Sequence, residues 1–370
     1  MNETDREIKL FFAGDVMTGR GIDQILAHPG RPELRERFIK DARSYVELAV
    51  RRHGRFETPV EPSHIWGDGL EILASEAPHA SVINLETSIT RSDQFWPLKY
   101  VHYRMHPDNV GCLLAAPIDV CTLANNHVMD FGRAGLLETL RTLEDAGLIF
   151  AGAGRDLEEA TRAAVIELDG GSRLFVVACA SPTSGVPHSW AAGRQRPGVN
   201  LLDDLSPGDA DAVLEAIPDD RGDRDLVVVS IHWGSNWGYE VHDKQIDFAH
   251  RLVEGGVDII HGHSSHHIRP LEVYRRKLVI YGCGDLVTDY EGIGGYEDWR
   301  GDLGGMYFAT FSLPEKKLTD LQVVPTQMRK MKLRRAGADD ARWLAQTLAR
   351  ISERFDTGFE LRRGDVIGLR

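Results

Sequence analysis

Histidine is concentrated in one short stretch of this chain, "HGHSSHHIRP" at 261–270, directly after the apolar run "VDII". Four imidazoles fall within seven residues there: His261, His263, His266 and His267. Imidazole is a common ligand of transition metal ions, although a polar loop after a buried strand would give the same pattern. Gly262 is expected to let the backbone turn sharply where the strand ends. Other parts of the chain must therefore show whether these histidines form a metal site or only belong to a polar loop.

Polar side chains of the same chemical kind follow other apolar runs. In chain order, these are Asp15, Glu86, Asn126 with His127 and Asp130, His232, His263 with His266, and Asp285. Ligands of open α/β sheets bind beyond the carboxyl ends of the strands, so these groups are expected at one edge. Taken singly, each has a simpler interpretation, such as a helix cap, a turn or a core histidine. Their recurrence at successive run ends favours a metal site. Carboxylate, amide and imidazole together suit Mn, Fe or Zn.

Short runs rich in Val, Ile and Phe must position these groups, and most are continuous, which is typical of strands covered on both faces. Runs predicted as strands are 8–14, 80–85, 118–124, 148–153, 173–180, 225–231, 256–262, 277–283, 305–313 and 318–328. Helical patterns occupy 134–147, 209–217, 244–256 and 338–355. This alternation predicts an α/β layered fold, and we expect the last two strands to form a hairpin in a mixed sheet. Long irregular stretches at 27–66, 182–208 and 286–304 are expected to be loops around a site.

The composition narrows the possible partners. Of 370 residues, 43 are Lys or Arg and 56 are Asp or Glu, giving a formal net charge of −13, which argues against nucleic acid as a partner. The N-terminal sequence "MNETDREIKLFFAGD" does not read as a signal peptide, and no run approaches the length of a membrane span. We therefore expect a cytoplasmic protein without a membrane anchor. The four cysteines form no CxxC pair and are expected to be reduced thiols in or near the core.

Five motifs, in this order, resemble the CapA-type poly-gamma-glutamate capsule-synthesis family: "FAGDVMTGRG", "VINLETSIT", "LANNHVMDFG", "SIHWG" and "GHSSH". The likeness covers residues 8–290, and that family is similar to calcineurin-like metallophosphoesterases. The resemblance implies an α/β fold, a layered metallophosphoesterase-like β-sandwich flanked by helices, with two divalent transition metal ions (Mn, Fe or Zn) at one end of the sheets. We expect this domain to span 1–335, with the C-terminal helix and tail of 336–370 packed on the same domain.

The resemblance also implies ligands, carried over position by position: Asp15 and His266 for one ion, His232 and His263 for the other, Glu86 as the bridging carboxylate and Asn126 as the amide ligand. His127 matches the catalytic histidine. Two positions depart from the phosphoesterase pattern. Met17 stands where that pattern has a histidine, and two serines rather than one residue separate His263 from His266. Asp285 stands where the capsule family commonly has asparagine. His261 and His267 are expected to face away from both ions.

The implied chemistry is hydrolysis by a water that two metals activate. His127 would protonate the leaving group or position the electrophile, and Asp130 would fix its tautomer, with a turn residue as the alternative for Asp130. Asp285 is a candidate hydrogen-bond partner of a bound imidazole, or a ligand itself. Residues close to the motifs are expected to bind substrate, with a surface arginine or a core aromatic as the alternative: Arg20, Arg104, Arg269 and Trp233, with Trp237 and Tyr239 beside it.

The substrate class stays open between a phosphoester and a gamma-glutamyl-type amide. The expected partner is an anionic small molecule or a gamma-glutamyl peptide or polymer. An alternative of a different class is a non-catalytic polyglutamate-binding accessory protein of a polymer synthetase, for which Met17 is the main evidence.

Overall fold

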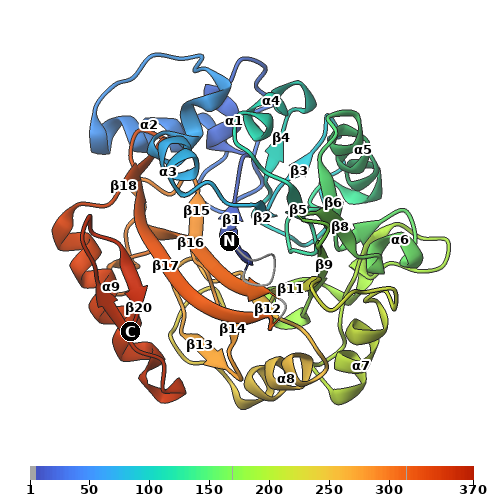
Figure 1. Ribbon diagram of the computed structural model, residues 1–370. Coiled ribbons are helices and arrows are strands. Elements are labelled where there is room, and N and C mark those ends of the chain that lie inside the picture. Colours follow the sequence, from blue (N-terminus) through green and yellow to red (C-terminus); the bar gives the residue numbers. More distant parts are fainter. Residues whose placement is uncertain (1–5, 169, 314) are drawn as a thin grey trace.

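Two large β-sheets organise the computed structural model, which describes residues 6–168, 170–313 and 315–370 (Figure 1). The larger sheet has the order β19-β20-β17-β16-β1-β2-β5-β6, with β15 on β1 and β18 on β17. Its strands are β1 (Arg6–Val16), β2 (Ala80–Leu85), β5 (Val120–Thr122), β6 (Ile149–Ala151), β15 (Asp285–Val287), β16 (Leu303–Leu313), β17 (Lys317–Met328), β18 (Leu333–Arg335), β19 (Phe359–Leu361) and β20 (Ile367–Leu369).

The second sheet has the order β13-β14-β12-β11-β9-β8. Its strands are β8 (Ala164–Glu167), β9 (Arg173–Ala180), β11 (Leu226–His232), β12 (Ile259–His263), β13 (Leu271–Tyr274) and β14 (Lys277–Ile280). Two short pairs complete the strands: β3 (Ser88–Ile89) with β4 (Arg104–Met105), and β7 (Ala153–Gly154) with β10 (Gly198–Val199).

Both sheets are mixed, as predicted. β1, β2, β5 and β6 run parallel in the larger sheet, as do β9, β11, β12 and β14 in the smaller one. β16 and β17 form the expected antiparallel hairpin. Parallel neighbours bring their carboxyl ends to one edge, which is where the polar run ends were expected.

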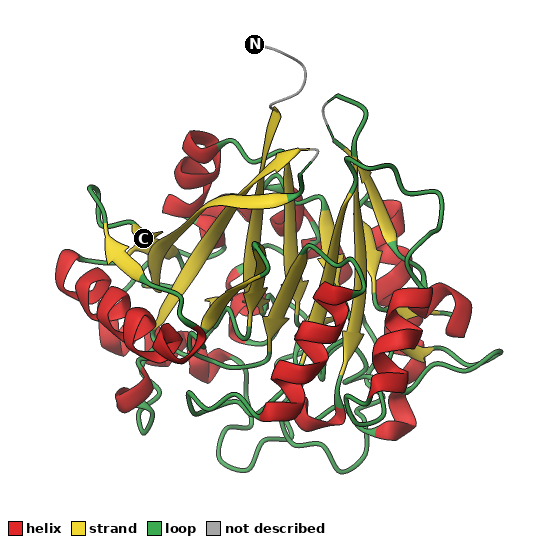
Figure 2. Ribbon diagram, turned by 60° about the horizontal axis from the view of Figure 1, so that its bottom comes forward, coloured by secondary structure: helices red, strands yellow, loops and turns green. Residues whose placement is uncertain are grey.

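The two sheets pack face to face, with β1 against β12 and β17 against β14. Figure 2 shows the strands gathered in the middle of the molecule with helices outside them. The sequence of β11 is continuously apolar because both faces of this strand are covered by apolar side chains. Val228 faces the core between the sheets, whereas Val227 and Val229 belong to a second apolar cluster that includes Phe248 of α8. The predicted α/β β-sandwich flanked by helices is therefore confirmed.

The helices surround this sandwich: α1 (Gly21–Ile25), α2 (Arg43–His53), α3 (Asp68–Glu76), α4 (Gly111–Leu114), α5 (Gly132–Asp145), α6 (Leu157–Thr161), α7 (Pro207–Glu215), α8 (Asp243–Glu254) and α9 (Ala338–Ser352). The four predicted helical patterns correspond to α5, α7, α8 and α9. The prediction of an irregular 27–66 was wrong in part, because α2 and a 3-10 helix at Pro62–Trp66 lie there. α2 is polar overall, and only Tyr45 and Ala49 of its residues are buried.

The C-terminal segment lies against the sandwich, with α9 in contact with β13 and β17. The division of the chain at 335/336 stays a prediction. All four cysteines are free and buried, as expected. Within the described ranges, no helix is both long and apolar enough to cross a membrane.

Candidate metal centre

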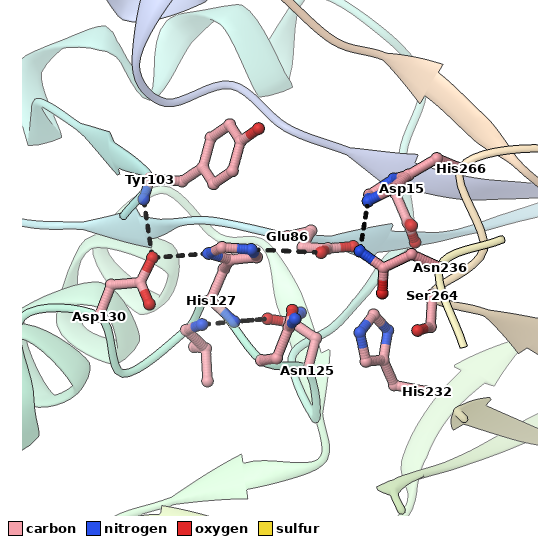
Figure 3. A network of polar contacts seen from close by, with 12 residues as sticks. Asp15, Glu86, Tyr103, Asn125, His127, Asp130, His232, Asn236, Ser264 and His266 are labelled. Atoms are coloured by element: carbon pink, nitrogen blue, oxygen red, sulfur yellow. Dashed lines mark hydrogen bonds and ion pairs between the residues drawn. The ribbon is translucent and has the colours of Figure 1, made fainter. Parts of the chain in front are cut away.

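The sheets bring ligand-type side chains together where the carboxyl ends of β1, β11 and β12 and the start of β15 meet. In the larger sheet, Asp15 near the end of β1 is in register with Asn84 of β2 and with Asp285 of β15. In the smaller sheet, His232 and His263 are the last residues of β11 and β12 and are in register with each other. Figure 3 shows Asp15, Glu86, His232 and His266 converging on one place from these different elements.

Two groups of ligand-type atoms share Asp15: Asp15 with His232 and His263, and Asp15 with His266 and Asp285. The ligand atoms of each group all lie within 4.8 Å of one another, and every member is buried. His263 and His266 thus fall in different groups, and their assignment to different ions stays a prediction. Glu86 lies beside them, because Asn84 Nδ2 donates to both Asp15 Oδ1 (2.8 Å) and Glu86 Oε2 (3.1 Å).

Several of the buried ligand-type atoms have no hydrogen-bond partner: Asp15 Oδ2, Asn126 Oδ1, His232 Nε2 and Asp285 Oδ2. A buried polar atom without a partner is costly, and native proteins pair most such atoms. All four atoms can donate a lone pair to a cation, and they come from four different segments. This donor set of carboxylate, amide and imidazole therefore fits a divalent transition metal ion.

The electrostatics of the cluster point the same way. Burial and the nearby Asp285 raise the pKa of Asp15 to about 7, and burial and Asp15 raise the pKa of Glu86 well above its usual range. Burial lowers the pKa of His232 and of His263, so both rings are neutral. Crowded carboxylates beside neutral imidazoles are the arrangement that a bound cation stabilises.

His266 differs from His232 and His263 in the direction of its pKa shift. Its Nδ1 lies 3.0 Å from Asp285 Oδ1, and its Nε2 lies 3.0 Å from Asn236 Nδ2. Burial alone would lower the pKa of His266, but Asp285 and Asp15 outweigh it and the pKa is raised. Asp285 is therefore both a partner of this imidazole and a member of the same ligand-type group.

His127 stands beside the cluster with its two ring nitrogens in different surroundings. Nδ1 lies 2.7 Å from Asp130 Oδ2, whereas Nε2 faces Glu86 Oε1 at 3.8 Å (Figure 3). The expected orientation of the ring by Asp130 is thus present in the structure. Burial and the Lys99 ammonium lower the pKa of His127 to about 4, so the imidazole is neutral near pH 7.

Lys99 is a contact that the sequence did not indicate. Its ammonium donates to Asn126 O and to Asp130 Oδ1, and lies 3.0 Å from His127 Nδ1. It comes from the loop between β3 and β4, where the neighbouring Leu98 is 98% exposed. No motif or periodicity marks a single lysine in a loop, and only the fold brings it here.

Asn84 and Asn125, which were not predicted as ligands, connect the segments of the site through hydrogen bonds. Asn125 Nδ2 donates to Asn84 Oδ1 (3.0 Å) and Leu85 O (2.9 Å). Its Oδ1 accepts from the backbone N–H groups of His127 and Val128. Asn125 therefore fixes the turn that presents His127, and the pair "NN" before His127 was the available signal.

The predicted substrate-binding arginines require correction, because protein groups already engage all three guanidinium groups. Arg20 binds Asp289 through two nitrogens and also reaches Glu36. Arg104 donates to Ser92 O, Asp93 and Arg31 O. Arg269 donates to Glu240 O and Ser235 O. All three are buried, so each supports a loop instead of facing a substrate.

Trp233 was also assigned wrongly. It is fully buried, donates from Nε1 to Tyr281 O at 3.0 Å, and packs on Phe248. Trp237 lies beside the cluster instead, with its ring 5.6 Å from that of His266. The period of two along a strand puts positions 231 and 233 on the same face, and Ile231 belongs to the cluster behind the second sheet.

The loop after β12 differs from the expectation in two respects. Gly262 does not make the turn; it lies within β12, where a Cβ would come within 2.4 Å of Ile280 O. The turn falls at Ser264, whose φ is 99°. His261 does not face away, because it shares a strand face with His263. Ser230 Oγ links His261 Nδ1 (3.1 Å) to His263 Nε2 (2.9 Å). His267 does turn aside, with Nδ1 on Ile268 O.

These features define a class of protein, an α/β sandwich with a buried centre of carboxylates and imidazoles. The centre lies where the carboxyl ends of strands from both sheets meet, and it is compatible with divalent metal binding. Residues 9–290 match the family model "Bacterial capsule synthesis protein PGA_cap", and the chain belongs to that family.

Named relatives agree with this assignment. A "Probable polyglutamine synthesis accessory protein" of Mycobacterium tuberculosis is 48% identical over 94% of this chain and 92% of that protein. The "PGA biosynthesis protein CapA" of Bacillus subtilis is 26% identical over 77% of this chain and 64% of its own length. A solved structure described as a novel phosphatase from Mycoplasma pneumoniae aligns at 12% identity and a TM-score of 0.47, covering 87% of this chain and 94% of that chain. A likeness of that size supports no conclusion about activity.

Proposed function

We propose that this protein is a metal-dependent hydrolase whose buried centre holds two divalent transition metal ions, Mn, Fe or Zn. The observation that carries the proposal is the convergence of buried ligand-type atoms without hydrogen-bond partners at the ends of both sheets. The two groups that share Asp15 support two ions rather than one. The ligands in this proposal are Asp15, Glu86, Asn126, His232, His263, His266 and Asp285.

Asp285 enters this set on structural grounds. Met17 occupies the position where the phosphoesterase pattern has a histidine, and its side chain is fully buried. The backbone N–H of Met17 donates to Val287 O, which joins β1 to β15. That pairing brings Asp285 into register with Asp15. Asp285 thereby supplies a third ligand-type residue beside Asp15 and His266.

When bound, the ions would polarise a substrate oxygen and lower the pKa of a water molecule. The protein's own contribution is to move a proton at His127 Nε2, which faces the centre while Asp130 holds Nδ1. A neutral ring with Nδ1–H on Asp130 leaves the Nε2 lone pair free to accept a proton. His127 can then return that proton to the leaving group, an effect of about 10²–10⁴ in rate.

The bond cleaved is proposed to be a gamma-glutamyl-type amide, with a phosphoester as the second possibility. Membership of the capsule-synthesis family supports an amide-linked glutamate polymer or peptide as substrate. Arginine often binds phosphate groups through two hydrogen bonds, and the three arginines near the motifs are engaged by protein groups instead.

The alternative is a non-catalytic protein that binds polyglutamate beside a polymer synthetase. The name of the Mycobacterium tuberculosis relative, an accessory protein, favours this alternative. Both functions use the same centre, but only the hydrolase requires His127 to exchange a proton.

The test combines metal content with turnover on one sample. Protein purified without chelator should contain at least about one equivalent of Mn, Fe or Zn, and less than about a tenth, even after metal is supplied, contradicts the centre. Gamma-glutamyl-p-nitroanilide, poly-gamma-glutamate, p-nitrophenyl phosphate and bis-p-nitrophenyl phosphate cover the candidate bonds. Metal and polymer binding without turnover on any of them supports the alternative.

Two variants separate the roles of neighbouring residues. His127→Ala should keep its metal and lose turnover by about 10²–10⁴. Asn126→Ala should lose metal affinity first. His28→Ala, at an exposed position, is the matched control and should change neither. Loss of metal in His127→Ala would make that residue a ligand.

A further inference from the structure

Two tyrosines bridge the halves of the centre. The Tyr103 ring stands edge-on to His127, with ring centroids 4.6 Å apart and an interplanar angle of 84°. The Tyr290 ring stands edge-on to His266, at 5.3 Å and 89°. Tyr103 Oη donates to Tyr290 Oη at 2.8 Å. The hydroxyl pair therefore lies between the proton-carrying histidine and one of the ligand-type histidines.

Figure 3 shows the Tyr103 side chain beside the row that runs from Asp130 through His127 to Glu86. Its hydroxyl points toward the side where Asp15 and His266 lie. Tyr290 lies beside His266, because its ring contacts the imidazole and its hydroxyl accepts from Tyr103.

The pair has one hydroxyl proton more than its mutual hydrogen bond uses, because each phenol carries one donor. Tyr103 is fully buried, whereas Tyr290 is half-buried. Since Tyr103 donates to Tyr290, the proton left over belongs to Tyr290, the more exposed of the two side chains.

Both tyrosines are held firmly. The backbone N–H of Tyr103 donates to Asp130 Oδ2 at 2.7 Å, the same oxygen that lies 2.7 Å from His127 Nδ1. Tyr290 follows Asp289, which binds the Arg20 side chain and the Gly21 N–H. The hydroxyl is therefore positioned before any ligand arrives.

The positive charge of Arg20 lies close to both tyrosines and favours hydrogen-bond donation from their hydroxyls. Its guanidinium carbon lies 4.5 Å from the Tyr103 ring centroid and 5.4 Å from that of Tyr290. A cation near a phenol makes its O–H a better donor toward an anionic oxygen. Arg20 thus acts on the site through the tyrosines, although it is not free to bind an anion itself.

We propose that Tyr290 donates its hydroxyl hydrogen bond to the substrate oxygen that gains negative charge, the carbonyl or phosphoryl oxygen at the centre, with Tyr103 as its positioning residue. This assigns a further catalytic residue and rests on the proposed function. It also assigns the ligand class: a group that presents a tetrahedral oxyanion between His127 and His266.

The test uses inorganic phosphate as a tetrahedral oxyanion probe, titrated calorimetrically into Mn²⁺-loaded full-length protein. Tyr290→Phe removes the hydroxyl and keeps the ring against His266. It should weaken phosphate binding by about tenfold or more, because hydrogen bonds to charged groups are the stronger ones. Tyr103→Phe keeps the donor but frees it, and should cost less. Tyr274→Phe, whose hydroxyl donates to Glu254 away from the centre, is the control and should bind phosphate as the wild type does.

Turnover gives a second readout. With an active wild type, Tyr290→Phe should lower kcat by about 10–10³ while KM changes little, which is typical of losing an oxyanion donor. Metal content and thermal unfolding of the variant must match the wild type.

The outcomes separate this inference from the proposed function. Unchanged phosphate affinity in Tyr290→Phe, or no phosphate binding by the metal-loaded wild type, overturns the role of Tyr290. Phosphate binding that depends on Tyr290 in a protein without turnover keeps the oxyanion site and overturns the hydrolase.

Discussion

Arg20 offers the sharpest test of what a buried charge does in this protein. Its side chain is 2% exposed and binds Asp289 at 2.5 Å and Glu36 at 2.8 Å, with both carboxylates also largely buried. Arg20→Met keeps the length and much of the volume but leaves two carboxylates without their cation. Breaking a buried ion pair in this way costs about 3–5 kcal/mol, a large part of the roughly 5–15 kcal/mol that stabilises a typical protein.

Arg43 provides the matched control. It binds Asp41 at the same 2.5 Å, but its side chain is 66% exposed. Arg43→Met should therefore lower the free energy of unfolding by no more than about 1 kcal/mol. Arg20→Lys, which keeps the charge and loses the two-pronged contact with Asp289, should fall between the two.

The assay is urea unfolding of chelator-treated protein, followed by circular dichroism and tryptophan fluorescence, with coincident transitions required for a free energy. A loss of less than about 1 kcal/mol in Arg20→Met would refute the structural role. A raised KM or phosphate Kd with unchanged stability would instead restore Arg20 as an anion-binding residue.

Other predictions follow from particular contacts. Burial lowers the pKa of His261 from 6.5 to about 4, so between these values the unfolded state binds more protons than the folded state and stability falls with falling pH. The free energy of unfolding should drop by about 2 kcal/mol from pH 7 to pH 5 on this account, and His261→Gln should flatten that slope in urea titrations with chelator present. Ser264→Gly should keep or raise the melting temperature because φ is 99° there, whereas Ser264→Val should lower it, by about 1–3 kcal/mol in unfolding free energy. Lys99→Met should lower kcat about tenfold or more without metal loss, because the ammonium holds Asp130 and Asn126 O; Lys99→Arg should restore part of it in the same assay.

The apolar runs of the sequence identify the central strands of both sheets and several of the polar residues that end them, but not shorter strands such as β8, β13 and β15. A strand covered on both faces must be apolar throughout, so each run and its polar end can be recognised locally. Asp15, His232 and His263 were predicted at one edge of the fold for this reason, and the structure brings them within one group, although Asp15 was expected with His266 at the other ion. The α/β class followed from the order of runs and helical patterns.

Which charged and aromatic groups are available to a ligand depends on contacts between distant parts of the chain. Arg20 is engaged by Asp289, 269 positions further along the chain, and Tyr103 by Tyr290, 187 positions further. Sequence proximity to a motif gave no information about such partners, because the order of strands within the sheets sets which distant loops meet. Whether a side chain faces a substrate or supports a loop depends on which loops the strand order brings into contact. For this reason the substrate-binding role of the arginines was assigned wrongly and the contact of Lys99 with the site was missed.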